Sequence, residues 1–325
     1  MSEDFFKIAV LSDIHYASDA EKMRGEYELR TAKNRFQKTF LKLFRHFVWK
    51  KDPFAHNHDL ENFIKRCNEV DLVVALGDYS CDSGFIGVVD DATFTSAKEC
   101  LEQLRSKFGN KFLGVIGDHE LGKMSLVGGK GGLRISSYYR AVQELKLEPV
   151  WILRKFDFVF IGVASTLAAL KVYEAEVLDT ERQAWSEARE AFLEKLNYVF
   201  SSLTENDRII LFCHDPTAIP WLASEPELAK RLSQIELTLI GHLHSELVFL
   251  TSKILAGIPT IRFLGNSIRR MTHALNEARV WKKFNTHLCP ALSGIELLKN
   301  PAYLELILYH DRRRGIKINR CSLAT

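Results

Sequence analysis

Short apolar runs separated by longer amphipathic stretches constrain the fold of this chain more than any other feature. Six runs are rich in β-branched or aromatic residues, as buried strands are; they cover 7–11, 71–76, 112–116, 158–163, 209–212 and 237–240. Helical apolar spacing fills the intervals, at 30–49, 60–69, 92–107, 136–147, 180–201 and 225–233. Strands that alternate with helices predict an α/β fold. Three further strands are predicted after residue 245, at 247–251, 258–264 and 303–309.

Acidic or imidazole side chains follow five of the six runs. The five segments are Ser12-Asp13-Ile14-His15, Gly77-Asp78, Gly117-Asp118-His119-Glu120, Cys213-His214-Asp215 and Gly241-His242-Leu243-His244. Only the run 158–163 continues without an acid or imidazole, into Ala164 and Ser165. A single Gly-Asp is usually a turn, and a single Asp at a strand end is often a helix cap. Five repetitions at strand ends, where loops of α/β sheets converge, instead favour one shared site.

Spacing within the segments suits the binding of a small ion. Asp13 and His15 stand two residues apart, as do His242 and His244, so on an extended backbone each pair would point to the same side. Three glycines are expected to allow sharp turns and a close approach of a ligand to the backbone: Gly77, Gly117 and Gly241.

Seven side chains make up the predicted metal-ligand set: Asp13, His15, Asp78, Asp118, His214, His242 and His244. Imidazole and carboxylate together suit first-row transition metals such as Mn, Fe and Zn. A single ion needs only three or four protein ligands, so seven suit two ions that share a bridging carboxylate. Such pairs, about 3.5–4 Å apart, recur in phosphoryl chemistry. We therefore expect two divalent or trivalent transition-metal ions, Mn first, with Fe or Zn as alternatives.

The order of the segments resembles the signature of the calcineurin-like metallophosphoesterases: D-x-H, G-D, G-N-H-[DE], an isolated H and G-H-x-H. The resemblance extends from Asp13 to His244. It implies an α/β fold of a particular kind, a four-layer α/β/β/α sandwich with two mixed sheets flanked by helices. It also implies a dinuclear-metal hydrolase of a phosphoester or pyrophosphate bond, with a hydroxide that bridges the metals as nucleophile.

The resemblance further implies a role for each residue. One metal would be held by Asp13, His15 and His244, and the other by Asp118, His214 and His242. Asp78 would bridge the two. His119 would stay unligated beside them, as the catalytic residue that helps the leaving group or the transition state.

Two positions depart from the family's pattern. Asp118 stands where the family has Asn; it can still ligate a metal but adds a negative charge, so we expect a changed metal preference or rate without loss of activity. Some relatives carry an Asp three residues after the bridging Asp, where it orients the catalytic His. Cys81 occupies that position here, and the neighbouring Asp82 has no assigned role.

A basic and aromatic stretch, 30–51, lies between the first two segments. It holds eight Lys or Arg and no acid, with apolar residues at helical spacing. Two interpretations are open: a helix packed on the sheet with a solvated basic face, or an interfacial helix that lies on anionic lipid or covers a lipid substrate. A second basic cluster, Arg262, Arg269 and Arg270, could bind another phosphate of the substrate or be surface charge.

Organisation and location are expected to be simple. No repeat, low-complexity segment or Pro/Gly/Ser linker divides the chain, so we expect one domain, 1–325, with a basic helical insertion at about 18–70. Six cysteines form no CxxC pair, which indicates a reducing compartment. The first residues, MSEDFFKIAVLSDIHY, lack the bases of a signal peptide, and no apolar stretch could span a bilayer. A cytoplasmic protein, either free or peripheral to the membrane, fits these features.

Three functions are compatible with these features. The first is a metallophosphoesterase acting on a phosphorylated small molecule. The second is a pyrophosphatase of the UDP-2,3-diacylglucosamine type, acting on a lipid-nucleotide at an anionic membrane surface, as some family members do. The third is a non-catalytic metal-binding scaffold, although all metal positions and His119 are filled. Nucleic acid is not an expected partner, because the net charge is only +3. The sequence gives no indication of the oligomeric state.

Overall fold

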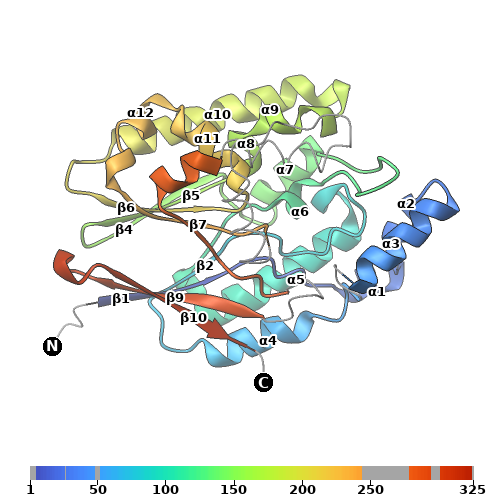
Figure 1. Cartoon of the computed structure of the whole chain (residues 1–325), viewed down its shortest axis with the longest axis horizontal. Helices are drawn as coiled ribbons and strands as arrows, with labels where there is room; N and C mark the ends of the chain where they lie inside the picture. The colour runs from blue at the N-terminus through green and yellow to red at the C-terminus, as the bar shows by residue number, and fades with distance from the viewer. Residues whose placement is uncertain (1–4, 26, 48–51, 244–277, 294–300, 324–325) are drawn as a thin grey trace.

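Two mixed five-stranded sheets form the centre of the protein (Figure 1). The computed structural model describes residues 5–25, 27–47, 52–243, 278–293 and 301–323. The first sheet has the order β10-β9-β1-β2-β3, with β1 (Phe5–Leu11), β2 (Leu72–Ala75), β3 (Phe112–Gly114), β9 (Ala302–Tyr309) and β10 (Ile316–Ser322). The second has the order β4-β5-β6-β7-β8, with β4 (Val150–Lys155), β5 (Phe158–Val163), β6 (Arg208–Cys213), β7 (Ile235–Ile240) and β8 (Thr286–Leu288).

Both sheets combine parallel and antiparallel pairs. In the first, β1 runs parallel to β2 and antiparallel to β9, with Phe5 opposite Tyr309 and Val10 opposite Leu304. In the second, β4 and β5 are antiparallel, whereas β5, β6, β7 and β8 run parallel. The central strands are continuous apolar runs because they are buried on both faces.

Alternate residues of the central strands serve two different cores. Ile8 of β1 and Phe212 of β6 belong to the core between the sheets. Ala9 of β1 and Leu211 of β6 face the other way, into the core beneath the helices. This alternation follows from the period of two in a strand, and it makes the molecule four layers deep.

Helices form the outer layers (Figure 1). Below the first sheet lie α4 (Asn57–Arg66) and α5 (Asp91–Phe108); above the second lie α8 (Ser165–Ala168), α10 (Arg182–Ser201), α11 (Ile219–Ala223) and α12 (Pro226–Ala229). The other α-helices are α1 (Asp19–Arg24), α2 (Tyr27–Thr31), α3 (Arg35–Phe47), α6 (Asp118–Leu121), α7 (Ile135–Gln143) and α9 (Leu170–Tyr173). Short 3-10 helices cover Gly87–Val89, Gly109–Lys111, Glu174–Glu176, Asp179–Glu181, Pro216–Ala218, Leu232–Gln234, Ala278–Phe284 and Arg312–Arg314. The expected α/β/β/α sandwich is confirmed.

Most of the predicted elements are present, with shifted ends. The six apolar runs form β1, β2, β3, β5, β6 and β7, and the run 303–309 forms β9. The predictions at 247–251 and 258–264 lie outside the described residues. Three strands were not expected: β4, β8 and β10. The last is an edge strand in which only exposed and half-exposed residues occur, so it lacks the apolar signal of a buried strand.

Two of the expected helices are broken. The stretch 30–49 contains the end of α2 and then α3, because Asn34 begins a new helix: its Oδ1 accepts a hydrogen bond from the Gln37 amide at 2.9 Å. The stretch 225–233 contains only α12 followed by the 3-10 turn Leu232–Gln234. Figure 1 shows α2 and α3 projecting from the side of the sandwich. None of the helices in the described ranges is both long and apolar enough to cross a membrane.

Candidate metal centre

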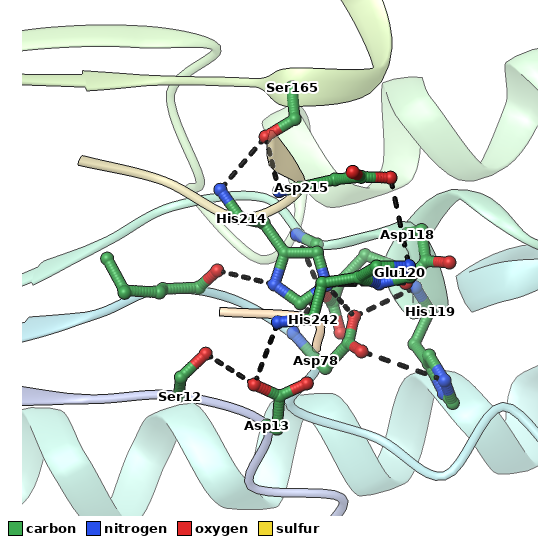
Figure 2. A network of polar contacts seen from close by, with 12 residues as sticks. Ser12, Asp13, Asp78, Asp118, His119, Glu120, Ser165, His214, Asp215 and His242 are labelled. Atoms are coloured by element: carbon green, nitrogen blue, oxygen red, sulfur yellow. Dashed lines mark hydrogen bonds and ion pairs between the residues drawn. The ribbon is translucent and has the colours of Figure 1, made fainter. Parts of the chain in front are cut away.

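The carboxyl ends of five strands meet at one place between the sheets (Figure 2). Asp13 and His15 follow β1, Asp78 follows β2, and Asp118 lies beyond β3 at the start of α6. From the second sheet, His214 follows β6 and His242 follows β7. Six of the seven predicted ligands are therefore brought together. The seventh, His244, lies outside the described residues, as do Arg262, Arg269 and Arg270.

One group of potential ligand atoms joins the two sheets. It consists of one atom each from Asp78, Asp118, His214 and His242, all within 4.8 Å of one another. His214 Nε2 lies 3.3 Å from Asp78 Oδ1 and 3.4 Å from Asp118 Oδ1. His242 Nδ1 lies 3.5 Å from Asp118 Oδ1. These spacings leave the donors facing a common centre.

A second group lies on the other side of Asp78. His15 Nε2 is 4.0 Å from Asp78 Oδ2 and 3.9 Å from Asp13 Oδ1, and His119 Nε2 is 3.7 Å from Asp78 Oδ2. Thus one oxygen of Asp78 faces His214 and the other faces His15. A carboxylate that turns its two oxygens toward two separate donor groups has the geometry of a bridging ligand.

The burial of the carboxylates indicates that the site needs cations. Asp13, Asp78 and Asp118 are each at most 1% exposed. Burial raises the pKa of Asp78, although the nearby His214 opposes the rise. Three buried carboxylates in one pocket are unfavourable unless positive charge compensates them. Carboxylate oxygens and imidazole nitrogens in this number fit two transition-metal ions.

Protons on the histidines also compensate the negative charge of the buried carboxylates. Burial alone would lower the pKa of His214, but Asp78 and Asp118 outweigh it and raise that pKa well above the ordinary value. Burial would raise the pKa of Asp118, but His242 and Lys123 hold it well below its usual range. The pocket therefore attracts positive charge.

Neighbouring groups fix the orientation of His214. Its Nδ1 lies 2.9 Å from the Leu76 carbonyl oxygen, which can only accept, so Nδ1 carries a proton and Nε2 is the nitrogen turned to the carboxylates, where a proton or a metal ion can bind it. Ser165 Oγ accepts hydrogen bonds from the His214 and Asp215 amides, both at 2.9 Å. Ser165 follows β5, the single apolar run without an acid or imidazole. That run therefore supports the site instead of supplying a ligand.

Four of the predicted ligands have a left-handed backbone conformation, which sets the direction of their side chains. The φ angles are 51° at Asp13, 50° at His15, 57° at Asp78 and 64° at His242. Residues other than glycine seldom adopt such angles, and they cluster at functional sites. The expectation that the D-x-H pair lies on extended backbone is therefore wrong. Strand β1 ends at Leu11, and the turn that follows redirects both side chains.

Only one of the three motif glycines is required for its backbone angle. Gly77 has φ +107°, whereas Gly117 has φ −90°. The other two are needed for space: a Cβ on Gly117 would lie 2.3 Å from Asp78 Oδ1, and a Cβ on Gly241 would lie 1.9 Å from Ser12 Oγ. The expectation of three sharp turns is thus replaced by one turn and two close approaches.

Glu120 ties two strand ends together, a role that sequence reasoning missed. Its Oε2 accepts hydrogen bonds from the Asp78 amide at 3.0 Å and the Gly117 amide at 2.9 Å, and its Oε1 accepts from the Tyr79 amide at 2.8 Å. The signal was available, since Glu120 is the final residue of the G-D-H-E segment. Its carboxylate holds the loop of Asp78 against the loop of Asp118.

The first strand end is held from three directions. Asp13 Oδ2 accepts hydrogen bonds from Ser12 Oγ at 2.6 Å and from the His242 amide at 3.1 Å, which connects the two sheets. The Ser293 amide donates to the Asp13 carbonyl at 3.0 Å. The residues just after β8 thus support the first ligand of the chain.

His119 belongs to the second group with His15 and Asp78, and its ring has two further partners. Its Nδ1 is 3.0 Å from the Cys81 carbonyl oxygen, and its Nε2 contacts Lys123 Nζ. The position that holds an orienting Asp in some relatives therefore orients His119 through a backbone carbonyl instead. Asp82 binds elsewhere: its Oδ1 accepts from the Gly87 amide at 2.9 Å.

Comparison with known proteins agrees with the order of the motifs. The profile of a family described as calcineurin-like phosphoesterases matches residues 6–246. Among curated proteins, no significant match was found.

Three solved structures are similar over most of this chain. A dimetal phosphatase from Danio rerio is 14% identical, with 98% of this chain and 96% of that one covered and a TM-score of 0.48. A purple acid phosphatase from yellow lupin (Lupinus luteus) seeds is 12% identical, with 98% and 52% covered and a TM-score of 0.42. A metallophosphoesterase from Sphaerobacter thermophilus is 13% identical, with 97% and 88% covered and a TM-score of 0.34.

Proposed function

The chain belongs to the calcineurin-like phosphoesterase family and is a metal-dependent phosphoesterase, and from this premise we propose how its residues divide the work. Asp13 and His15 hold one metal ion, and Asp118, His214 and His242 hold the other. Asp78 bridges the two, and His119 serves the leaving group. His244 is proposed to complete the first set on the strength of the motif alone.

The division of the Asp78 oxygens carries this proposal. Oδ1 lies 3.3 Å from His214 Nε2, and Oδ2 lies 4.0 Å from His15 Nε2. When bound, the two ions would supply Lewis acidity, lowering the pKa of water toward ~7 and neutralising charge on the phosphoryl oxygens. A water-derived hydroxide is then the proposed nucleophile for in-line displacement at phosphorus.

The protein's own contribution is orientation in a closed environment. The Leu76 carbonyl fixes the His214 ring, and the Cys81 carbonyl fixes the His119 ring. Glu120 clamps the loops of Asp78 and Asp118. Because these supports are backbone groups and a buried carboxylate, the donors need little rearrangement during the reaction.

The direct test combines metal analysis with hydrolysis. The purified chain, supplied with Mn, should bind two ions and cleave bis(p-nitrophenyl) phosphate; Asp19→Ala, which changes a carboxylate that is 93% exposed, is the matched control. Two bound ions without turnover on phosphomonoesters, diesters and pyrophosphates would instead favour the scaffold interpretation. Mn is the proposed ion, and higher turnover with Fe or Zn would replace it.

A lipid-linked substrate is a second candidate, favoured by the surface of α3. Phe36, Phe40 and Leu43 are 81%, 45% and 54% exposed, and their spacing of four and then three residues places them on one helix face. Four exposed side chains around them are basic, Lys33, Arg35, Lys38 and Lys42, and none of the exposed residues described in α3 is acidic. Leu41 is buried and attaches the helix to the protein. An apolar stripe with flanking cations suits an anionic lipid surface.

The position of α2 supports this candidate. The Gly128 backbone packs so closely on Thr31 that a Cβ there would lie 1.9 Å from the Thr31 carbonyl oxygen. Lys130 Nζ donates to the Arg30 carbonyl at 3.4 Å. The loop after His119 is thus in contact with the base of the projecting helices. We propose that a membrane-bound α3 brings a lipid-nucleotide to the pocket.

The two candidates differ in their dependence on the lipid. A lipid-nucleotide pyrophosphatase should cleave UDP-diacylglucosamine in mixed micelles much faster than UDP-glucose, which has the same pyrophosphate without acyl chains. Equal rates on the two would leave a general small-molecule phosphoesterase as the function.

A further inference from the structure

Lys123 contacts the imidazole of His119, and the function proposed above gives this lysine no role. Its Nζ is in contact with His119 Nε2. On the other side of the ring, Nδ1 lies 3.0 Å from the Cys81 carbonyl oxygen. A carbonyl can only accept and an ammonium can only donate, so these partners assign the ring proton to Nδ1 and the lone pair to Nε2.

This assignment restricts what His119 can do. Nε2 is the nitrogen that faces the centre, 3.7 Å from Asp78 Oδ2. In the tautomer set by its neighbours, Nε2 carries no hydrogen and cannot donate one to a leaving group. The N–H groups at that point belong to Lys123.

The charge of the lysine acts on two buried carboxylates, Asp82 and Asp118. Asp82 is fully buried, and its Oδ2 makes no hydrogen bond among the described residues. Burial raises the pKa of Asp82 well above its usual value, and the Lys123 ammonium is the first charge to oppose that rise. The same ammonium acts on Asp118, the carboxylate that replaces the family's Asn. Lys123 therefore supplies one positive charge where Asp118 adds one negative charge.

We propose that Lys123 is the group that protonates the leaving oxygen, with His119 as the residue that positions it. The inference rests on the proposed function. As the bond between phosphorus and the leaving oxygen breaks, its electron pair stays on that oxygen, which takes one proton from the ammonium. Water supplies the oxygen of the new P–O bond and releases its proton to solvent, and the neutral Lys123 amine regains a proton from water.

The acidity of an ammonium suits this step. An ammonium carries a proton that a strongly basic leaving oxygen can take. The alkoxide of an alcohol or sugar is a stronger base than the amine, so transfer to it is favourable at the end of bond breaking. The charge also stabilises the developing negative charge before the proton moves.

Leaving-group dependence tests the proposal. Methyl phenyl phosphate and methyl p-nitrophenyl phosphate differ only in the basicity of the phenolate that leaves. Lys123→Met should lower turnover of the phenyl ester by about a hundredfold and that of the p-nitrophenyl ester by less than about tenfold, because p-nitrophenolate needs little protonation. A merely structural role would lower both equally.

Two further variants serve as tests. One separates proton transfer by Lys123 from the effect of its positive charge, and the other controls for the loss of any lysine. Lys123→Arg keeps the positive charge but does not release a proton, so it should preserve p-nitrophenyl turnover and still lose phenyl turnover. Full recovery of both would overturn proton transfer. Lys98→Met is the matched control, since the Lys98 side chain is 55% exposed on α5; it should behave as the unchanged protein.

A readout without turnover checks the geometry. In the metal-free protein, ¹⁵N spectra of the imidazoles should give the Nδ1–H tautomer for His119, and Lys123→Met should move its Nε2 resonance. An Nε2–H tautomer in the unchanged protein would overturn the inference. If the unchanged protein hydrolyses neither ester, the proposed function fails and the inference falls with it; if it hydrolyses both and Lys123→Met keeps their ratio, only the inference fails.

Discussion

The metal pocket buries charged side chains, whereas helix α3 exposes apolar ones, and each is the reverse of the usual arrangement in a folded protein. In the pocket, Asp13, Asp78 and Asp118 are carboxylates with at most 1% exposure. On α3, Phe36 is a large apolar side chain with 81% exposure. Buried charge is unfavourable until a cation joins it, and an exposed apolar stripe is unfavourable until something covers it. Each region thus indicates a ligand, but only the pocket is held rigidly enough to define what it binds.

The surrounding contacts explain that difference. Hydrogen bonds between loops hold several pocket residues, such as the bond from the Asp78 amide to the Glu120 carboxylate and the bond from the His242 amide to the Asp13 carboxylate. The helix α3 is attached through Leu41, and most of its other described side chains are exposed. We therefore expect substitutions in the pocket to affect metal binding and catalysis strongly, and substitutions on α3 to affect binding to lipid without changing metal binding or hydrolysis of soluble substrates.

Asp78→Ala should have the largest effect. Both oxygens of Asp78 face donor groups, so its removal should release at least one metal ion and lower turnover by about a thousandfold or more. Metal content per chain and hydrolysis of bis(p-nitrophenyl) phosphate measure the two effects. If the variant kept two ions and full turnover, the bridging role would be wrong, and the pocket would be no more constrained than α3.

His119→Ala should separate catalysis from metal binding within the pocket. Its two ring nitrogens contact Cys81 and Lys123, so the metal content should stay at the level of the unchanged protein. Turnover should fall by roughly a hundredfold, as for the loss of a general acid–base group or its support. Loss of metal in parallel with turnover would instead make His119 a ligand.

Phe36→Ser combined with Phe40→Ser tests the other side of the comparison. Removal of two exposed rings should weaken binding to vesicles of anionic phospholipid by about tenfold. Hydrolysis of a soluble diester should not change, because neither ring belongs to the pocket. Tyr198→Ser, which removes a ring that is 75% exposed on α10, is the matched control and should bind vesicles normally. Unchanged vesicle binding by the double variant would exclude α3 as a lipid surface.

Asp207→Asn should have the smallest effect, a small loss of folding stability. It shows what an ordinary ion pair outside the pocket contributes. Burial would raise the pKa of Asp207, but the Thr204 amide and Arg154 lower it below the usual value. A lowered pKa in the fold means that the stabilisation is present above the unfolded pKa, about 3.9, and disappears as pH falls through the folded value. The variant should lose about 0.5–1 kcal/mol at neutral pH.

Chemical unfolding at a series of pH values measures this difference. The gap between Asp207→Asn and the unchanged protein should be constant from pH 7 to about 5 and should narrow below about pH 4. A gap that widened on acidification would contradict the sign of the shift.

The pocket could be predicted from the sequence because its Asp and His residues can be recognised there by residue type and by their place after apolar runs. Asp13, Asp78 and His214 each follow a buried run, and the loops at the carboxyl ends of strands in α/β folds converge. What the sequence did not reveal depends on the folded backbone. The left-handed angle at Asp13 has no sequence signature, and Glu120 was visible in its motif but acts through amides of other loops.

The contacts of Lys123 and Ser165 were unpredictable for a related reason. Lys123 lies beyond the end of α6, so helical spacing from His119 does not describe its position. Ser165 follows β5, the strand that carries no acid or imidazole, and its role depends on the neighbouring β6. In the fold, β10 was missed because an exposed edge strand needs no apolar alternation.

The pairing of β1 with β9 has a consequence for the newly made chain. Phe5 pairs with Tyr309, and the Ser293 amide donates a hydrogen bond to the Asp13 carbonyl. During synthesis, the first strand and the loop after it therefore lack these partners until the last part of the chain has been made. When the ribosome has synthesised every predicted ligand, it has not yet made Ser293, which holds the Asp13 carbonyl, or β9, which pairs with β1. Domains generally fold as units during synthesis, and this sheet includes β9. We therefore expect the nascent protein to acquire metal affinity after synthesis of β9, late in translation.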